Sequence, residues 1–205
     1  MTLTSTVRRE ARPAAVAGTC PDHLLSLIRA AVRGGSSWAE TADLVADALR
    51  ATSPEPADLL PASLRRGDPA GYQSHLLHVE PGGSFSVSAM VWRPGQQTPV
   101  HDHVAWCVTA VRQGQEYEEI FALADDALAD GGRADGALAD GGRALRLVAR
   151  NVNPAGSVSG FAPPGDIHRV RNTGDTVAIS LHVYGTDISR LGTSIRREYT
   201  LRVIP

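Results

Sequence analysis

The sequence predicts a mainly β protein, an antiparallel barrel or sandwich preceded by α-helices. In the first third of the chain, apolar residues recur at the helical period. From Tyr72 onward, short segments of strand composition alternate with turns rich in glycine and proline. Because the helices precede the strands and do not alternate with them, we expect one antiparallel core with an α-helical N-terminal cap.

Two stripes of apolar residues predict the helices of this cap. In residues 21–35 the stripe includes Leu24, Leu25 and Ile28 and ends at two glycines. Residues 38–51 repeat the pattern, and a shorter helix is expected within residues 57–68, although Pro61 disfavours it. The chain is therefore divided into a flexible arm (residues 1–20), a helical cap (21–70) and a β-barrel (71–205), with cap and barrel forming one structural domain.

Seven segments have the composition of short strands, and turn formers such as the Pro-Pro-Gly at residues 163–165 separate them. They are residues 72–80, 85–93, 106–114, 116–123, 144–150, 167–172 and 176–185. A near-perfect tandem repeat, ALADGGRADG followed by ALADGGRALR at residues 127–146, is expected to form the solvated tip of a hairpin. Its carboxylates lack the spacing of a calcium loop, so we assign it no chemical role.

The composition argues against several classes of partner. The formal net charge is −2 and no long basic run is present, which disfavours nucleic acid and anionic membrane surfaces. No apolar stretch reaches the length of a membrane span, and the first residues do not resemble a secretory signal. We expect a cytoplasmic monomer in which Cys20 and Cys107 remain thiols.

The run TPVHDHVAWC, residues 98–107, holds two histidines one residue apart in a strand-like segment. Residues i and i+2 of a strand share a face, so His101 and His103 project together and Asp102 is turned away. Imidazole suits iron, copper, zinc and nickel. The pair thus predicts part of a metal site, with two surface histidines of no function as the alternative.

A third histidine, His168, follows a tight turn in PPGDIHRVRN, at the spacing P-x-G-x-x-H-x-x-x-N. A turn that delivers one histidine to the next strand supplies what a third ligand on the same face requires. Together with Gly95, His101 and His103, it resembles the two motifs of the cupin superfamily, which implies a cupin-type antiparallel β-barrel with a metal in its mouth. The glutamate of the first motif is replaced by Cys107, so the three imidazoles would leave a divalent metal its full charge, which favours an anionic ligand such as a thiolate.

The segment TVAISLHVYG, residues 176–185, alternates polar and apolar residues. Ser180, His182 and Tyr184 share one face, and burying them is costly unless they bond to one another. They are expected to form a hydrogen-bonded relay beside the metal, or else a purely structural network. A serine two residues from its histidine on one strand has poor geometry for a hydrolase nucleophile.

In combination, HDHVAWC, GDIHRVRN and SLHVYG resemble the bacterial thiol dioxygenases, that is, cysteine dioxygenase and 3-mercaptopropionate dioxygenase. The resemblance covers residue 72 to the C-terminus and implies Fe(II), a small thiol and O₂ as reactants, and a sulfinate as product. It implies His101, His103 and His168 as iron ligands. Ser180, His182 and Tyr184 would be the catalytic relay, with the hydroxyl of Tyr184 acting in the reaction.

The same resemblance bears on the role of Cys107 and on the residues that bind the substrate. Cys107 matches a cysteine that forms a thioether link to the catalytic tyrosine in some relatives, so it is either one half of a Cys107–Tyr184 crosslink or a buried thiol beside Trp106. The substrate anchor is an arginine or a glutamine in relatives, but here that position is Ser74. We expect cysteine or a related thiol carboxylate, bound by Ser74, His75 or Arg197, with Arg196 as a further candidate.

Two alternatives are kept open. One is a cupin iron oxygenase that acts on a different small metabolite. The other is a non-catalytic cupin that binds a metal or a small ligand, which would have no use for the relay. Three histidines also suit zinc or nickel.

Overall fold

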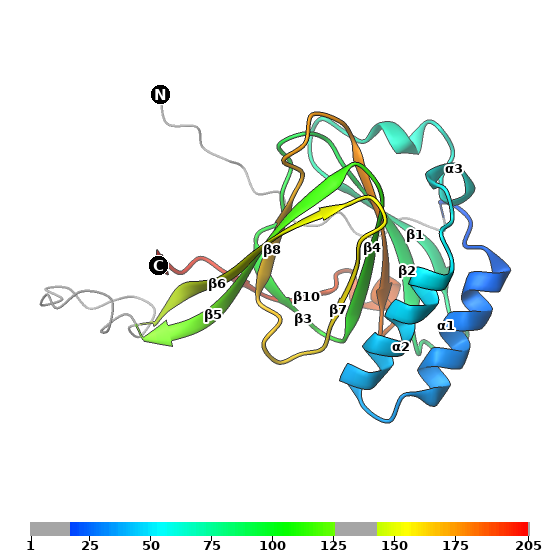
Figure 1. Cartoon of the computed structure of the whole chain (residues 1–205), viewed down its shortest axis with the longest axis horizontal. Helices are drawn as coiled ribbons and strands as arrows, with labels where there is room; N and C mark the ends of the chain where they lie inside the picture. Colours follow the sequence, from blue (N-terminus) through cyan, green and yellow to red (C-terminus); the bar gives the residue numbers. More distant parts are fainter. Residues whose placement is uncertain (1–16, 126–142, 205) are drawn as a thin grey trace, which may run out of the picture.

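The computed structural model describes residues 17–125 and 143–204, which form two facing β-sheets with helices along one side (Figure 1). The helices are α1 (Asp22–Gly34), α2 (Trp38–Ala51), α3 (Pro56–Leu59) and α4 (Ile188–Leu191), with a 3₁₀ turn η1 (Leu64–Arg66). The strands are β1 (Gln73–Val79), β2 (Ser86–Trp92), β3 (Val100–His103), β4 (Cys107–Gln113), β5 (Gln115–Asp125), β6 (Arg143–Pro154), β7 (Val158–Phe161), β8 (His168–Arg171), β9 (Ala178–Tyr184), β10 (Ile195–Tyr199) and β11 (Val203–Ile204).

The strands lie in the order β1-β2-β9-β4-β7 in one sheet and β10-β3-β8-β5-β6-β11 in the other. Neighbouring strands are antiparallel except for the short β11, which runs parallel to β6. The two sheets curve around a common interior, as the view along the barrel shows (Figure 1). This confirms the predicted mainly β, cupin-type barrel with an N-terminal helical cap.

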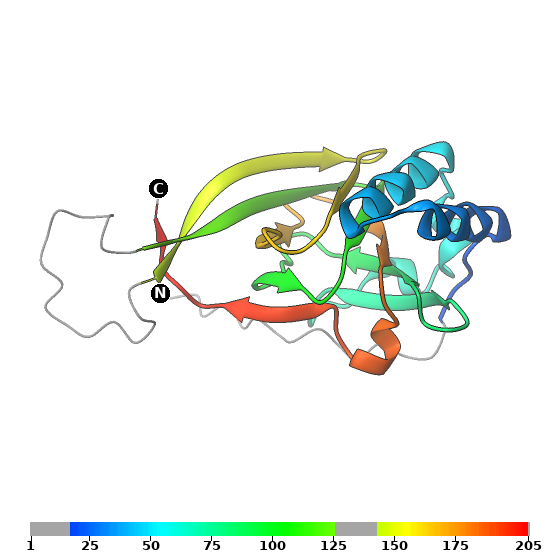
Figure 2. The same cartoon turned by 90° about the horizontal axis from the view of Figure 1, so that it is seen from below.

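The helices cover the outer face of the first sheet, and Figure 2 shows α1 and α2 side by side above it. The buried stripe of α1, which includes Leu24 and Ile28, packs with Val45 and Leu49 of α2 against apolar residues of β2, β4 and β9. Ser37 begins α2 by accepting a hydrogen bond from the Glu40 N–H (3.2 Å).

Strands β2 and β9 are buried on both faces, and the alternation of their side chains separates two environments. Val87, Ala89 and Leu181 face the helices. The residues between them, among them Met90 and His182, face the barrel interior. This explains why the polar row of β9 lies inside the barrel.

The structure differs from the predicted boundaries at several points. The third helix is split into α3 and η1, with Pro61 between them, while α4, β7, β10 and β11 were not predicted. The backbone N–H groups of Ala17 and Thr19 donate to carbonyls of Leu76 and Leu59, so this part of the expected arm belongs to the domain. Residues 1–16 and most of the tandem repeat lie outside the described residues. In the part of the chain that is described, no helix is both long and apolar enough to cross a membrane.

Candidate metal centre

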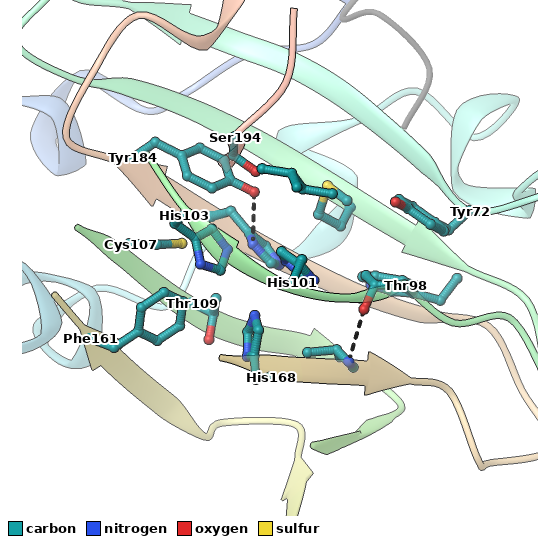
Figure 3. A pocket seen from close by; sticks show the side chains of 15 residues that line it. Tyr72, Thr98, His101, His103, Cys107, Thr109, Phe161, His168, Tyr184 and Ser194 are labelled. Carbon is teal, nitrogen blue, oxygen red and sulfur yellow. Dashed lines mark hydrogen bonds between the residues drawn. The ribbon is translucent and has the colours of Figure 1, made fainter. Parts of the chain in front are cut away.

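Three histidines from two neighbouring strands meet inside the barrel. His101 and His103 come from β3, and His168 begins β8, where it pairs directly with His101 in the antiparallel register. All three are buried, and their potential ligand atoms lie within 4.8 Å of one another. Figure 3 shows the three rings gathered beneath Tyr184, with Phe161 alongside.

Each of these imidazoles is held through Nδ1 by an oxygen acceptor. The bonds join His101 to the Pro99 carbonyl (3.0 Å), His103 to Asp166 Oδ2 (3.1 Å) and His168 to Glu118 Oε1 (2.7 Å). An acceptor at Nδ1 fixes the proton there and leaves the Nε2 lone pair for a metal. The orientation of the rings therefore fits a metal ligand set.

The electrostatic environment keeps His101 and His103 neutral. Burial, followed by repulsion from the neighbouring imidazoles, lowers the pKa of His101 and His103 well below the usual value. Although burial opposes it, hydrogen bonds from His168 and from Asn151 hold the pKa of the Glu118 carboxyl below its ordinary value. Neutral imidazoles backed by ionised carboxylates are the form that binds a divalent metal.

The polar row of β9 forms a chain of hydrogen bonds. Ser180 Oγ lies 2.9 Å from His182 Nε2, and the Tyr184 hydroxyl lies 3.2 Å from His182 Nδ1. Burial, with a smaller effect from His168, lowers the pKa of His182 to about 3, so its ring is neutral near pH 7. His182 and Tyr184 line the same pocket as the three histidines, and Figure 3 shows Tyr184 beside them.

The rest of the pocket wall is largely aromatic and apolar. Tyr72 stacks on Trp92 with their ring centroids 4.6 Å apart. The ring centroids of Phe161 and His103 are 4.7 Å apart. Met90 and Ile195 also line the pocket. Such a wall excludes water from the space beside the histidines, which strengthens polar interactions there.

Cys107 lies opposite Tyr184 in the register of β4 and β9, and both line the pocket. They also share a small buried cluster with Leu76 and Ile188. Trp106, by contrast, belongs to the core beneath the helices. The sequence neighbours Trp106 and Cys107 therefore face opposite sides of the sheet.

The structure does not bring the predicted substrate-binding residues together. Ser74 pairs with Met90 on the inner side of β1, and its buried hydroxyl has no hydrogen-bond partner among the described residues. His75, the next residue, must face the opposite side, where the core under the helices lies. Neither residue is part of the pocket lining.

Arg197 also lies outside the pocket lining. A bulge in β10 places it opposite Asp102, and its guanidinium lies 5.7 Å from the ring centroid of Tyr199. Arg196 forms an ion pair with Asp102, which is turned away from the metal-facing histidines. Strand alternation and the bulge direct His75 and Arg197 away from this pocket, and their role in substrate binding stays a prediction.

Three carboxylates inside the barrel were missed by the sequence analysis, namely Glu116, Glu118 and Asp166. Asp166 stands two residues before His168, and Glu116 and Glu118 alternate along β5. That alternation is a signal that they share a face. Which face is buried, however, depends on pairing between distant strands.

A barrel of two facing sheets, with three histidines that converge at its interior surface, defines a cupin with a candidate metal centre. The model of the cysteine dioxygenase type I family matches residues 39–193. The chain belongs to this family.

Two of the solved structures to which the chain is similar illustrate the fold. One is a Cupin 2 conserved barrel domain protein from Salinispora arenicola (22% identity over 58% of this chain and 78% of that chain, TM-score 0.37). The other is an uncharacterized conserved protein with a double-stranded beta-helix domain from Klebsiella pneumoniae (15% identity, 64% and 91%, TM-score 0.42).

Proposed function

We propose that the protein is an Fe(II)-dependent thiol dioxygenase, which converts a small thiol and O₂ to the sulfinate. The observation that carries the proposal is that three histidines oriented through Nδ1 share a pocket with Tyr184 and His182, which form a hydrogen-bonded chain with Ser180. Membership of the cysteine dioxygenase type I family supports it. We place it in a reducing cytoplasm, where the buried thiols of Cys20 and Cys107 would stay reduced.

His101, His103 and His168 would hold the iron. When bound, Fe(II) supplies open coordination positions for a thiolate and O₂ and the electrons that start oxygen reduction. The reaction balances without another reductant, because both oxygen atoms of O₂ end on the sulfur of the thiol.

The relay would act on the substrate side of the pocket. Tyr184 presents a hydroxyl whose position is fixed by His182, and His182 is fixed in turn by Ser180. A hydroxyl held in this way can orient the thiol and hydrogen-bond the oxygens of the forming sulfinate. The apolar wall of Met90 and Phe161 would keep bulk water away from the reacting sulfur.

Oxygen uptake by anaerobically purified, iron-loaded protein tests this function. The substrates to compare are cysteine, 3-mercaptopropionate, cysteamine and homocysteine, with the sulfinate identified by mass. We expect uptake with at least one of them, loss of uptake in His168→Ala, and retention in Glu119→Gln, whose carboxylate pairs with Arg169 away from the relay. If no thiol consumes oxygen above the blank, the thiol function is wrong. Metal binding without turnover would then favour a cupin oxygenase of another metabolite or a non-catalytic cupin.

A further inference from the structure

The strand that carries two of the three pocket histidines is short and depends on its neighbours. On the side of β8, one register pair, His101–His168, and the bond from the His103 N–H to Asp166 Oδ2 (2.8 Å) hold β3 in place. On its other edge, every residue of β3 has a partner on β10, the C-terminal strand beside it (Figure 1). The positions of both histidines therefore depend on how firmly β10 is attached.

Asp102, which lies between the two histidines, fastens β10 to β3. Its side chain projects from the opposite face of the strand and is 1% exposed. The Tyr199 hydroxyl donates a hydrogen bond to Oδ2 (2.8 Å), and the Arg196 guanidinium forms an ion pair with the same oxygen. Both partners belong to β10, so one buried carboxylate joins the two strands.

The bulge in β10 makes this ion pair possible. Ile195 pairs with His103. The next pair joins Arg197 to Asp102, which leaves Arg196 as the extra residue of the bulge. An extra residue bends its strand and re-aims a side chain, and here it turns Arg196 toward Asp102. Because Ile195 lines the pocket directly before the bulge, the same ion pair also fixes part of the pocket wall.

The two partners differ in how much they need each other. A buried carboxylate is costly unless a cation and hydrogen-bond donors compensate its charge. The second oxygen of Asp102, Oδ1, has no hydrogen-bond partner among the described residues, so compensation depends on Oδ2. The Arg196 side chain is 50% exposed and can be solvated alone. Loss of Arg196 would therefore leave an uncompensated charge in the sheet, and β3 and β10 would have to separate for water to reach it.

We propose that Asp102 and Arg196 are positioning residues of the metal centre, whose ion pair fastens β10 to β3 and thereby holds the two histidines of β3 in the orientation that binds one metal ion. The role in metal binding rests on the proposed function, but the fastening of the two strands does not. Simple electrostatics would give the opposite sign. Removal of a nearby positive charge strengthens the binding of a divalent cation, whereas removal of Arg196 should weaken it, because two ligands lose their position.

Anaerobic competition with a chromogenic chelator measures the affinity of the full-length protein for Co²⁺. We expect Arg196→Gln to lower this affinity about tenfold, the lower end of the range for partners behind metal ligands, because the rings keep their own Nδ1 bonds. Arg197→Gln is the matched control, since its guanidinium lies over the ring of Tyr199 and its exposed charge is screened. It should stay within about twofold of wild type. An affinity of Arg196→Gln that equals or exceeds that of wild type would overturn the proposal.

A second substitution tests whether the charge of Asp102 is the cause. In the double variant Asp102→Asn/Arg196→Gln no buried charge is left to compensate, and a neutral amide still accepts a hydrogen bond from Tyr199. We therefore expect the double variant to bind Co²⁺ about threefold more tightly than Arg196→Gln alone. A further fall in affinity would contradict the proposed role of the ion pair.

Hydrogen exchange of the metal-free protein tests the fastening itself. Backbone amides of β3 and β10 should exchange about tenfold faster in Arg196→Gln than in wild type or Arg197→Gln. Those of β2 and β9, in the other sheet, should keep their rates, which also shows that the variant is folded. Equal rates for β3 in all three proteins would rule the proposal out. If wild type binds no Co²⁺, the proposed metal centre fails, while the exchange rates still decide whether Asp102 and Arg196 hold the strands together.

Discussion

Cys107 and Tyr184 lie directly opposite each other across β4 and β9, with both side chains on the inner surface of the barrel. Opposite residues of an antiparallel pair are close enough for their side chains to touch. The register thus supports the crosslink for which Cys107 is a candidate, while the alternative of a plain buried thiol stays open.

A thioether between Cys107 and Tyr184 would remove one hydrogen from the thiol and one from the tyrosine ring, with O₂ as the oxidant. We predict that iron-loaded protein exposed to air and thiol loses two hydrogens by intact mass. Cys107→Ala should abolish this change, and Cys20→Ala, at a buried cysteine in the helix-facing core, should keep it. Unchanged mass, together with two titratable thiols after denaturation, would show that Cys107 stays free.

Glu118 orients His168 through the 2.7 Å bond to Nδ1, so its removal should weaken metal binding without removing a ligand. We predict that Glu118→Gln lowers metal affinity about 10- to 100-fold, whereas His168→Ala lowers it further. Competition with a chromogenic chelator measures both. Glu119→Gln is the matched control, and equal affinities in Glu118→Gln and wild type would contradict the orienting role.

Tyr184→Phe removes the hydroxyl at the pocket end of the relay and preserves the ring. We predict a fall in kcat of roughly 10²-fold, typical for a lost polar group at a reacting centre, with metal content unchanged. Oxygen-uptake kinetics and metal analysis of the same sample check this. A variant with wild-type kcat would remove Tyr184 from the mechanism.

The buried carboxyl of Glu116 should make the free energy of unfolding depend on pH. Its pKa in the folded protein is about 7, above the ordinary 4.5, so the folded state holds a proton that the unfolded state loses. Stability therefore falls as pH rises from about 4.5 to about 7, by roughly 3 kcal/mol for a shift of this size.

Denaturant unfolding at several pH values measures this contribution. Glu116→Gln should lack it, so that the variant gains stability relative to wild type as pH increases. A constant difference between the two proteins across this range would show that Glu116 does not titrate as described.

The parts of the site that follow from local alternation could be predicted from the sequence. His101 and His103 share a face because they are two residues apart, and the same rule places Ser180, His182 and Tyr184 in one row. The third histidine, His168, could be predicted from the Pro-Pro-Gly turn at residues 163–165 that precedes it. Such features depend on a few neighbouring residues.

The carboxylates behind the histidines depend on strand pairing instead. Glu118 meets His168 because β5 pairs with β8, and Glu116, two residues earlier on β5, is buried on the same side of the strand. Strand pairing also sets the direction of the residues expected to bind substrate. Only one of Ser74 and His75 can face inward, and an unpredicted bulge in β10 sets the direction of Arg197.

Anomalous diffraction from crystals of the Fe(II)-loaded protein, collected at the iron edge, tests the central claim most directly. We predict one peak per chain, about 2.1 Å from Nε2 of His101, His103 and His168, as is usual for metal–imidazole bonds. A peak elsewhere in the molecule, or rings whose Nε2 atoms point away from a common centre in the loaded protein, would contradict it.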